Sequence, residues 1–457
     1  MHTAKSVIPR AYDAVVVGCG VIGASTALAL SRKGYRVCVV DKNRSPGEGT
    51  TSYSSGVCRT FYSIPDSVSF AWEGYQYWKN WEDFIAVKDS KGYAKLRECG
   101  AALLRSSNSN EFLDKTVRCL FGAGIAVEEW DSQTATERLG KIGWDLSHSY
   151  CPRRIDDPSF GIPVAGQRIQ GAVYCKTVGY VSDPQLATQN LCLAAEHGGA
   201  QFKMQAAVVA VLQDRRRVVG VRLSDESIVH APIVINAGGP YSSRINDLAF
   251  PNDVSSSVPN DMRVSTRPMR QEVAYTQAPP GVDLDKDGLI TADLDVGAYW
   301  RPEVGNKLLI GGIEPACDPP DWFDGDPKDL NVNLTDDWTN YVYRAALRIP
   351  TLPIPSSRNM QGIVSLYDVT PDWTPIYDKS ALGGYYMAIG TSGNQFKNAG
   401  VAGELMAKII DSCENGHDHD NIPLQFETTL SNPGNHVNLR SFSRLRSAND
   451  TCGSVIG

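Results

Sequence analysis

The chain has 457 residues, of which 42% are hydrophobic and 21% are charged. This composition is typical of a globular protein with two or three cores, and it excludes the disordered and fibrous classes. The formal net charge is -7 and the basic residues are scattered, which argues against a nucleic-acid-binding protein.

The eleven cysteines and the N-terminus bear on the cellular compartment. The cysteines lie far apart and form no C-x-x-C pair, so we expect reduced, buried thiols in a cytoplasmic protein. Residues 1–13, MHTAKSVIPRAYD, lack the charged and then apolar pattern of a secretion signal. The apolar run over residues 14–30 is shorter than the ~20 residues of a membrane span and contains glycines, so we expect no span.

Residues 15–42, VVVGCGVIGASTALALSRKGYRVCVVDK, are typical of a nucleotide-binding βαβ unit. Residues 14–17 predict a buried strand, a helix follows through Leu30 and is stopped at Gly34, and residues 35–40 predict a second buried strand. Gly18 allows the tight turn, Gly20 the approach of a pyrophosphate and Gly23 the packing of helix on strand. Asp41 ends the second strand, where its carboxylate accepts from ribose hydroxyls and repels a 2′-phosphate. FAD or NAD fits this unit, whereas NADP does not.

Three later stretches bear on the choice between FAD and NAD. Residues 49–63, GTTSYSSGVCRTFYS, are rich in hydroxyls and include Arg59. Residues 231–243, APIVINAGGPYSS, predict a buried strand that enters a Gly-Gly turn. Residues 383–411 predict a strand, a glycine- and amide-rich turn, and a helix with Val401, Leu405 and Ile409 on one face.

Together with the opening unit, these stretches resemble the D-amino-acid-oxidase-like superfamily of FAD-dependent oxidoreductases, and within it the sarcosine oxidase and glycine oxidase branch. The resemblance covers most of the chain and includes residues 179–202, 267–276, 297–315 and 366–378. It implies an α/β fold with a Rossmann-like FAD-binding domain built from discontinuous segments and a mixed-sheet substrate domain. We expect the FAD-binding domain over 1–95, 170–245 and 360–457, and the substrate domain over 96–169 and 246–359.

The resemblance favours FAD over NAD and implies how FAD is held. Reduced flavin carries negative charge on its N1–C2=O2 edge, which backbone N–H groups of residues 393–396 at a helix N-terminus would stabilise. A nicotinamide needs no such cradle. The expected FAD-binding residues are Gly18, Gly20, Val21, Ile22, Gly23, Asp41, Lys42, Ser54, Ser55, Gly56, Arg59, Val208, Ala237, Gly238, Gly390, Ser392, Gly393, Asn394, Gln395, Phe396 and Lys397.

Three cations are candidates for the substrate site. Lys397 matches the lysine with which sarcosine oxidases hold the substrate carboxylate, and a cation at the start of a helix needs such a reason. Arg59 matches the arginine that this family places beside the flavin ring, whereas the further arginine three residues on is Tyr62 here. Arg301 either supplies the missing positive charge from the other domain or is a surface arginine of a strand.

Two tyrosines and two differences from sarcosine oxidases complete the expected site. Tyr299 and Tyr367 match residues that wall the substrate pocket. Ser365 stands where sarcosine oxidases carry the cysteine linked to flavin, so we expect FAD to be held non-covalently. Leu309 replaces a lysine that assists oxygen reduction. Either Lys307, on the same strand face, takes its place, or another carrier than oxygen accepts the electrons.

Two patterns resemble metal sites without completing one. Residues 283–288, DLDKDG, begin like a calcium loop, but Leu294 stands where a bidentate glutamate belongs, so we expect a hairpin loop. Residues 417–420, HDHD, lie in a polar stretch after the last predicted helix, and we expect a solvated surface. No metal site is expected.

The resemblance implies an FAD-dependent enzyme that oxidises the C–N bond of a secondary or tertiary amino acid, N-methyl or cyclic, or of a related amine. Hydride transfer to flavin N5 would give an imine, which water hydrolyses. Oxygen or another carrier would accept the electrons. An FAD-dependent 2-hydroxy-acid dehydrogenase and a flavin-bearing sensor without turnover are the alternatives.

Overall fold

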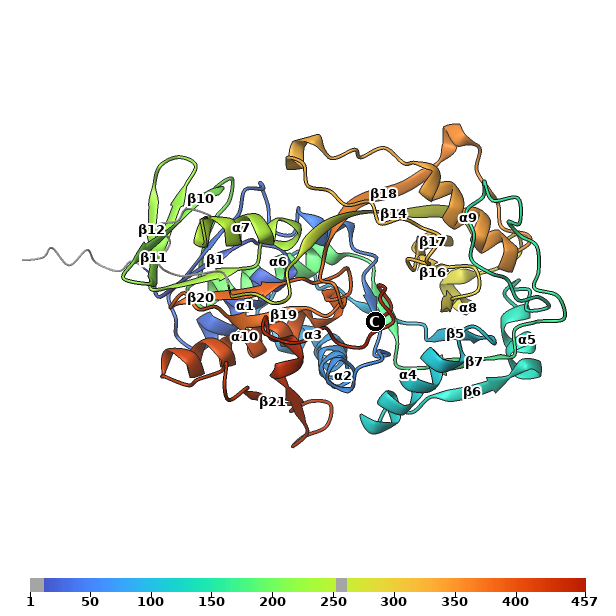
Figure 1. The fold of residues 1–457 in the computed structure, drawn as a ribbon, viewed down its shortest axis with the longest axis horizontal. Coiled ribbons are helices and arrows are strands. Elements are labelled where there is room, and N and C mark those ends of the chain that lie inside the picture. Colours follow the sequence, from blue (N-terminus) through green and yellow to red (C-terminus); the bar gives the residue numbers. More distant parts are fainter. Residues whose placement is uncertain (1–11, 252–260) are drawn as a thin grey trace, which may run out of the picture.

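The computed structural model describes residues 12–251 and 261–457. The expectation about a secretion signal falls largely on residues 1–11, outside the described residues. Two main sheets organise the chain (Figure 1). The six-stranded sheet lies at the left of that view and the eight-stranded sheet at the right, with the C-terminal end of the chain between them.

The six-stranded sheet carries the predicted nucleotide-binding unit. Five strands are parallel and the edge strand β19 is antiparallel to β20. In spatial order the strands are β19 (Ile376–Lys379), β20 (Tyr385–Ile389), β13 (Ile233–Asn236), β1 (Ala14–Val17), β2 (Val37–Val40) and β9 (Gln201–Lys203).

Both faces of this sheet are covered, which explains the continuous apolar runs of its strands. Val16 of β1 packs among three helices, and Val15 packs against a three-stranded sheet on the opposite face. The helices are α1 (Val21–Arg32), α6 (Pro184–His197) and α10 (Ala399–Glu414), and the small sheet contains β10 (Val208–Asp214), β11 (Arg217–Leu223) and β12 (Ile228–His230).

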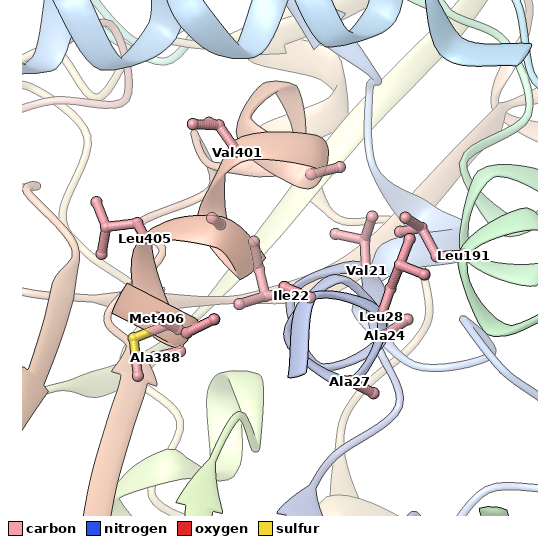
Figure 2. Close-up of a cluster of buried hydrophobic side chains, with 14 of the residues drawn as sticks. Val21, Ile22, Ala24, Ala27, Leu28, Leu191, Ala388, Val401, Leu405 and Met406 are labelled. Carbon is pink, nitrogen blue, oxygen red and sulfur yellow. The ribbon is translucent and has the colours of Figure 1, made fainter. Parts of the chain in front are cut away.

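Helices α1 and α10 pack closely enough to hydrogen-bond to each other. Ile22 of α1 lies beside Met406 of α10 (Figure 2). Gly403 permits this approach, because its N–H donates to Ser25 Oγ at 2.9 Å and a Cβ would lie 2.2 Å from Ser25 O. Packing therefore fixes α10, and with it the turn before α10, against the start of the nucleotide-binding unit.

The eight-stranded sheet is mixed, since only β15 and β5 pair in parallel. Helix α4 covers one face and α9 the other. Its strands in order are β18 (Gln361–Val369), β14 (Arg267–Gln277), β17 (Lys307–Gly312), β16 (Ala298–Glu303), β15 (Ile290–Asp293), β5 (Ala101–Arg105), β7 (Gly171–Cys175) and β6 (Glu128–Asp131). The helices packed on it are α4 (Asn110–Gly122), α5 (Ser132–Gly140), α8 (Leu284–Asp287) and α9 (Asp336–Arg348).

The remaining elements lie outside the two main sheets. They are α2 (Pro65–Lys79), α3 (Trp81–Ile85), α7 (Ser242–Ala249), β3 (Val57–Cys58), β4 (Leu96–Glu98), β8 (Gly179–Val181), β21 (Gln425–Glu427), β22 (His436–Asn438), and the 3-10 helices η1 (Thr50–Tyr53), η2 (Gly239–Tyr241), η3 (Pro327–Asp329), η4 (Ser357–Asn359), η5 (Phe396–Asn398) and η6 (Leu439–Phe442).

Two strands pair with the sheet of the other predicted domain. β7 and β18 lie within the ranges assigned to the FAD-binding domain, yet both pair inside the eight-stranded sheet. The end of β18 contacts segments next to the six-stranded sheet, since the Asp368 carboxylate accepts from Gly390 N at 2.6 Å and from Ser242 Oγ at 3.0 Å. The division of the chain into domains otherwise stays a prediction.

Three local expectations were wrong. Residues 284–287 form the short helix α8, capped by Asp283, rather than a hairpin loop. Of residues 417–420, Asp418 is exposed as expected, but His419 is 3% exposed, because it lies against the buried ion network of Arg444 and Asp378. All eleven cysteines are free thiols, but Cys151 and Cys452 are exposed.

Residues 12–251 and 261–457 contain no helix long and apolar enough to cross a bilayer, and no His, Cys, Asp and Glu cluster that would hold a metal.

The contact of α1 with α10 predicts the cost of Gly403→Ala. The new methyl group meets the Ser25 carbonyl, so the helices must separate, and we expect the free energy of unfolding to fall by about 1–3 kcal/mol in urea titrations. Gly122→Ala is the control, because that helical glycine has open space around it and should not lose stability. Equal stability of the two variants would contradict the close packing.

Candidate active site

A cavity of about 530 Å³ begins at the carboxyl ends of the parallel strands. Its size falls within the roughly 300–1,000 Å³ of ordinary ligand sites. Its walls combine the opening βαβ unit, the segment after β2, the turn before α10 and strands β14 and β18. Most of the predicted FAD-binding residues line it, namely Gly18, Gly20, Val21, Ile22, Asp41, Lys42, Ser54, Ser55, Val208, Ala237, Gly238, Gly393, Gln395 and Phe396.

The glycine loop has the geometry that its sequence predicts. Gly18 has φ 108° and a Cβ there would lie 2.2 Å from Ala237 O, so only glycine allows the chain after β1 to come this close to the chain after β13. Gly20 opens onto the cavity. Gly23 does not line it, because Gly23 faces Gly18 O, to which a Cβ would approach within 2.0 Å.

Asp41 both faces the cavity and holds the glycine loop. Its Oδ2 accepts from Cys19 N at 2.6 Å and its Oδ1 accepts from Asn43 N at 2.7 Å. Each carboxylate oxygen keeps a further acceptor position for hydroxyls of a ribose in the cavity. The acid therefore fixes its own orientation before a ligand binds.

Some predicted residues lie behind the cavity wall, and others were missed. Gly56 and Gly390 are packing positions, where a Cβ would lie 2.1 Å from Val181 O and 2.5 Å from Thr370 Cγ2. Ser392 is buried and donates to Gly390 O. The missed residues come mainly from the 3-10 helices η1, η2 and η3 and from the long strands β14 and β18. No local sequence pattern marks which side chains of these two strands face a ligand. Examples are Thr50, Thr51, Tyr241, Gln271, Val273, Ile363 and Leu366.

A second cavity of about 50 Å³ lies next to the large one and shares Ser54, Ser55, Tyr367, Gly393 and Phe396 with it. It brings together four of the five predicted catalytic residues. These are Arg59, Tyr299, Tyr367 and Lys397.

Lys397 is a buried lysine in η5, 3% exposed, and not a solvated residue of a helix start. Its Nζ donates to Tyr62 Oη at 2.8 Å and to Asn394 O. Burial and the nearby positive charge of Arg59 lower the pKa of Lys397 well below its ordinary value. Tyr62, which replaces the second arginine of the family, thus acts as a hydrogen-bonding partner of this lysine.

Arg59 is also buried, at 5% exposure, with its guanidinium 4.0 Å from the ring centroid of Tyr62. It donates to Val455 O at 2.6 Å and to Phe61 O. Within residues 12–251 and 261–457, neither Arg59 nor Lys397 forms an ion pair with a carboxylate. Burial without a counter-ion disfavours the charged forms of both groups, and an anion in the cavity would favour them again.

Two other predicted cations do not reach either cavity. Arg301 is buried, but it pairs with Glu303 at 2.9 Å, donates to Ser55 O and lies 4.3 Å from the Tyr180 ring centroid. Its charge is thereby used within the protein. Lys307 lies at the far end of the β16–β17 hairpin, opposite Glu303, and does not line either cavity.

The sequence profile of the family described as FAD dependent oxidoreductase matches residues 13–409. The chain belongs to this family. It is an enzyme that uses FAD, and the predicted superfamily is confirmed.

Curated relatives are distant but cover most of the chain. A Bos taurus protein named FAD-dependent oxidoreductase domain-containing protein 1 is 22% identical over 418 residues, which is 88% of this chain and 82% of that protein. The 4-methylaminobutanoate oxidase (formaldehyde-forming) of Paenarthrobacter nicotinovorans is 23% identical over 96% of this chain. This chain spans only 48% of that relative's length.

Solved structures of other proteins share the fold. L-proline dehydrogenase from P. horikoshii superposes with a TM-score of 0.71 at 18% identity, over 96% of this chain and 98% of that one. Glycine oxidase from Geobacillus kaustophilus gives a TM-score of 0.68 at 20% identity, over 90% and 97%. The predicted α/β fold with a Rossmann-like FAD-binding part and a mixed-sheet part is confirmed.

The residues present fit FAD. The Gly18 and Gly20 backbone and the start of α1 would hold the pyrophosphate, and Asp41 would hold the adenosine ribose. The turn at Gly393 and Gln395 closes the other end of the large cavity, next to the two cations. The large cavity therefore suits the cofactor, and the small cavity suits the substrate.

The cavity walls predict non-covalent FAD. Ser365 faces the large cavity, and no cysteine of the described residues lines either cavity. Acid precipitation of the holoenzyme should release all of the flavin into the supernatant, measured by absorbance. Flavin that stays with the pellet would contradict the prediction.

The lowered pKa of Lys397 predicts how anion binding depends on pH. The lysine is cationic only below its pKa, so the affinity of the FAD-loaded protein for benzoate should fall as pH rises, beginning well below the ordinary value of 10.5. The change of the flavin spectrum on titration gives the dissociation constant. Lys397→Met should remove this part of the pH dependence, and identical profiles for both proteins would contradict the assignment.

Proposed function

We propose that the enzyme oxidises the C–N bond of a secondary or tertiary amino acid, N-methyl or cyclic, to an imine that water hydrolyses. The observation that carries the proposal is the small cavity with Arg59 and Lys397, two buried cations without a carboxylate partner in the described chain. A carboxylate is the substrate group that such a pair binds through charge-assisted hydrogen bonds.

The side chains of the small cavity orient this substrate. Lys397 and Arg59 hold its carboxylate, and Tyr299 and Tyr367 limit the position of its amine. Burial raises the pKa of both tyrosines, so their phenols stay protonated and can donate hydrogen bonds. FAD, when bound, supplies the hydride acceptor.

The amine has to reach the site in its neutral form. None of the described side chains that line the small cavity is an aspartate, a glutamate or a histidine. The rate of flavin reduction should therefore rise with pH, as the substrate ammonium loses its proton.

The relatives support an amine that carries a carboxylate. Among them are proteins named for 4-methylaminobutanoate and for L-proline. We infer that oxygen or another carrier accepts the electrons, since Leu309 replaces the expected lysine and Lys307 does not line either cavity. A cytoplasmic location stays a prediction.

Anaerobic stopped-flow spectroscopy tests the proposal with the purified holoenzyme. Sarcosine, proline and pipecolate should bleach the flavin absorbance, and lactate should not. Addition of oxygen, and separately of a quinone, then distinguishes the acceptors. Faster bleaching by lactate than by any amine would contradict the proposal and favour a 2-hydroxy-acid enzyme.

Lys397→Met separates the role of this lysine from a general effect of charge. Loss of a charge-assisted hydrogen bond is worth about 1.5–3 kcal/mol, so KM for the amino acid should rise roughly 10- to 100-fold. Lys307→Met is the matched control, because Lys307 lies outside both cavities, and its KM should not change. Similar KM values for all three proteins would exclude Lys397 from carboxylate binding.

A further inference from the structure

The segment of residues 449–456 runs between the two main sheets (Figure 1). It ends beside the small cavity, which Val455 and Ile456 help to line. Asp372 anchors its beginning, since the Asp372 carboxylate accepts from Asn449 N at 2.9 Å and the Asp372 carbonyl accepts from Thr451 Oγ1 at 3.0 Å. Val455 and Ile456 are only 8% and 6% exposed. The segment is therefore packed into the protein.

The backbone of Val455 is bonded from both sides. Its carbonyl accepts from Arg59 Nη2 at 2.6 Å, and its N–H donates to Glu314 Oε2 at 2.8 Å. Glu314 follows β17 and also accepts from Gln271 Nε2, at 3.4 Å. One residue of the segment thus connects a carboxylate next to the eight-stranded sheet with a cation of the substrate cavity.

The side chains of Val455 and Ile456 form part of the wall of the small cavity. Phe61, Ile290 and Ala292 complete an apolar lining near the two cations. A ligand held there by its carboxylate has to place its remaining atoms against these walls. Because Val455 and Ile456 lie in the wall of this small cavity, the size of their side chains sets how much room those atoms have.

We propose that Val455 and Ile456 determine which substrates enter the small cavity and restrict these substrates to compact amino acids with a small N-alkyl group or a small ring. Glu314 is the residue that positions Val455 and Ile456. The inference rests on the proposed function, because it takes the small cavity as the substrate pocket. It adds the substrate size and assigns it to a segment that none of the family motifs contains.

Ligand size tests the role of the two apolar side chains. Acetate, pyrrole-2-carboxylate and benzoate are titrated into the holoenzyme, and dissociation constants are read from the flavin spectrum. Val455→Ala and Ile456→Ala should improve binding of benzoate relative to acetate by about tenfold or more, as expected for a pocket enlarged by one or more carbon atoms. Val229→Ala, a buried valine of β12 away from the cavities, should keep the wild-type ratio.

Each other outcome of this titration overturns the inference. An unchanged ratio in both variants shows that the segment does not select for size. An equal gain for all three carboxylates shows that the segment competes with ligands for Arg59 instead of shaping the pocket.

Two variants at Glu314 test its positioning role. Glu314→Gln keeps an oxygen that accepts from Val455 N, whereas Glu314→Ala does not. We expect Glu314→Ala to improve the binding of benzoate relative to acetate, as Ile456→Ala does. Glu314→Gln should keep the wild-type ratio of the two affinities. If both variants behave alike, the hydrogen bond to Val455 has no positioning role.

The readout separates this inference from the proposed function, because the titrations need no turnover. A shifted size ratio in a protein whose flavin no amine reduces would refute amine oxidation and leave the size selection standing. Reduction by amines with an unshifted ratio would refute the size selection alone.

Discussion

Two buried cations beside one small cavity are the constraint on which the active site depends. Arg59 and Lys397 have their charges removed from water and no carboxylate of the described chain beside them. Such burial costs several kcal/mol per ion unless other groups compensate. Here Tyr62 contributes its ring to Arg59 and its hydroxyl to Lys397, while backbone carbonyls accept from both cations. These neutral partners lower the cost and leave the positive charge available to an anion.

The fold supplies this arrangement by bringing distant segments to one point. Arg59 comes from the segment after β2, Lys397 from η5 and the two tyrosines from the eight-stranded sheet. Helix α2 holds η5 in place, since Trp78 donates to Lys397 O at 2.8 Å and stacks on Phe396. The interlocked α1 and α10 connect η5 to the nucleotide-binding loop. Cofactor site and substrate cavity are therefore parts of one packed unit.

The sequence predicted those features whose requirements lie within a short stretch. The βαβ unit is of this kind, because Gly18, Gly20 and Asp41 follow from one local pattern. Arg301 was expected as a candidate, but its partners Glu303 and Ser55 decide where its charge acts, and the motif does not show this. His419 resembled a surface residue because its partner Asp378 is remote in the chain. The segment at Val455 carries no pattern at all, and only three-dimensional packing places it at the cavity.

A crystal structure of the holoenzyme with pyrrole-2-carboxylate tests the central claim most directly. The account predicts the carboxylate of this ligand within hydrogen-bonding distance of both the Lys397 ammonium and the Arg59 guanidinium, and its ring against Tyr299, Tyr367 and Ile456. A carboxylate bound elsewhere, with Lys397 and Arg59 still paired only to the protein, would contradict it.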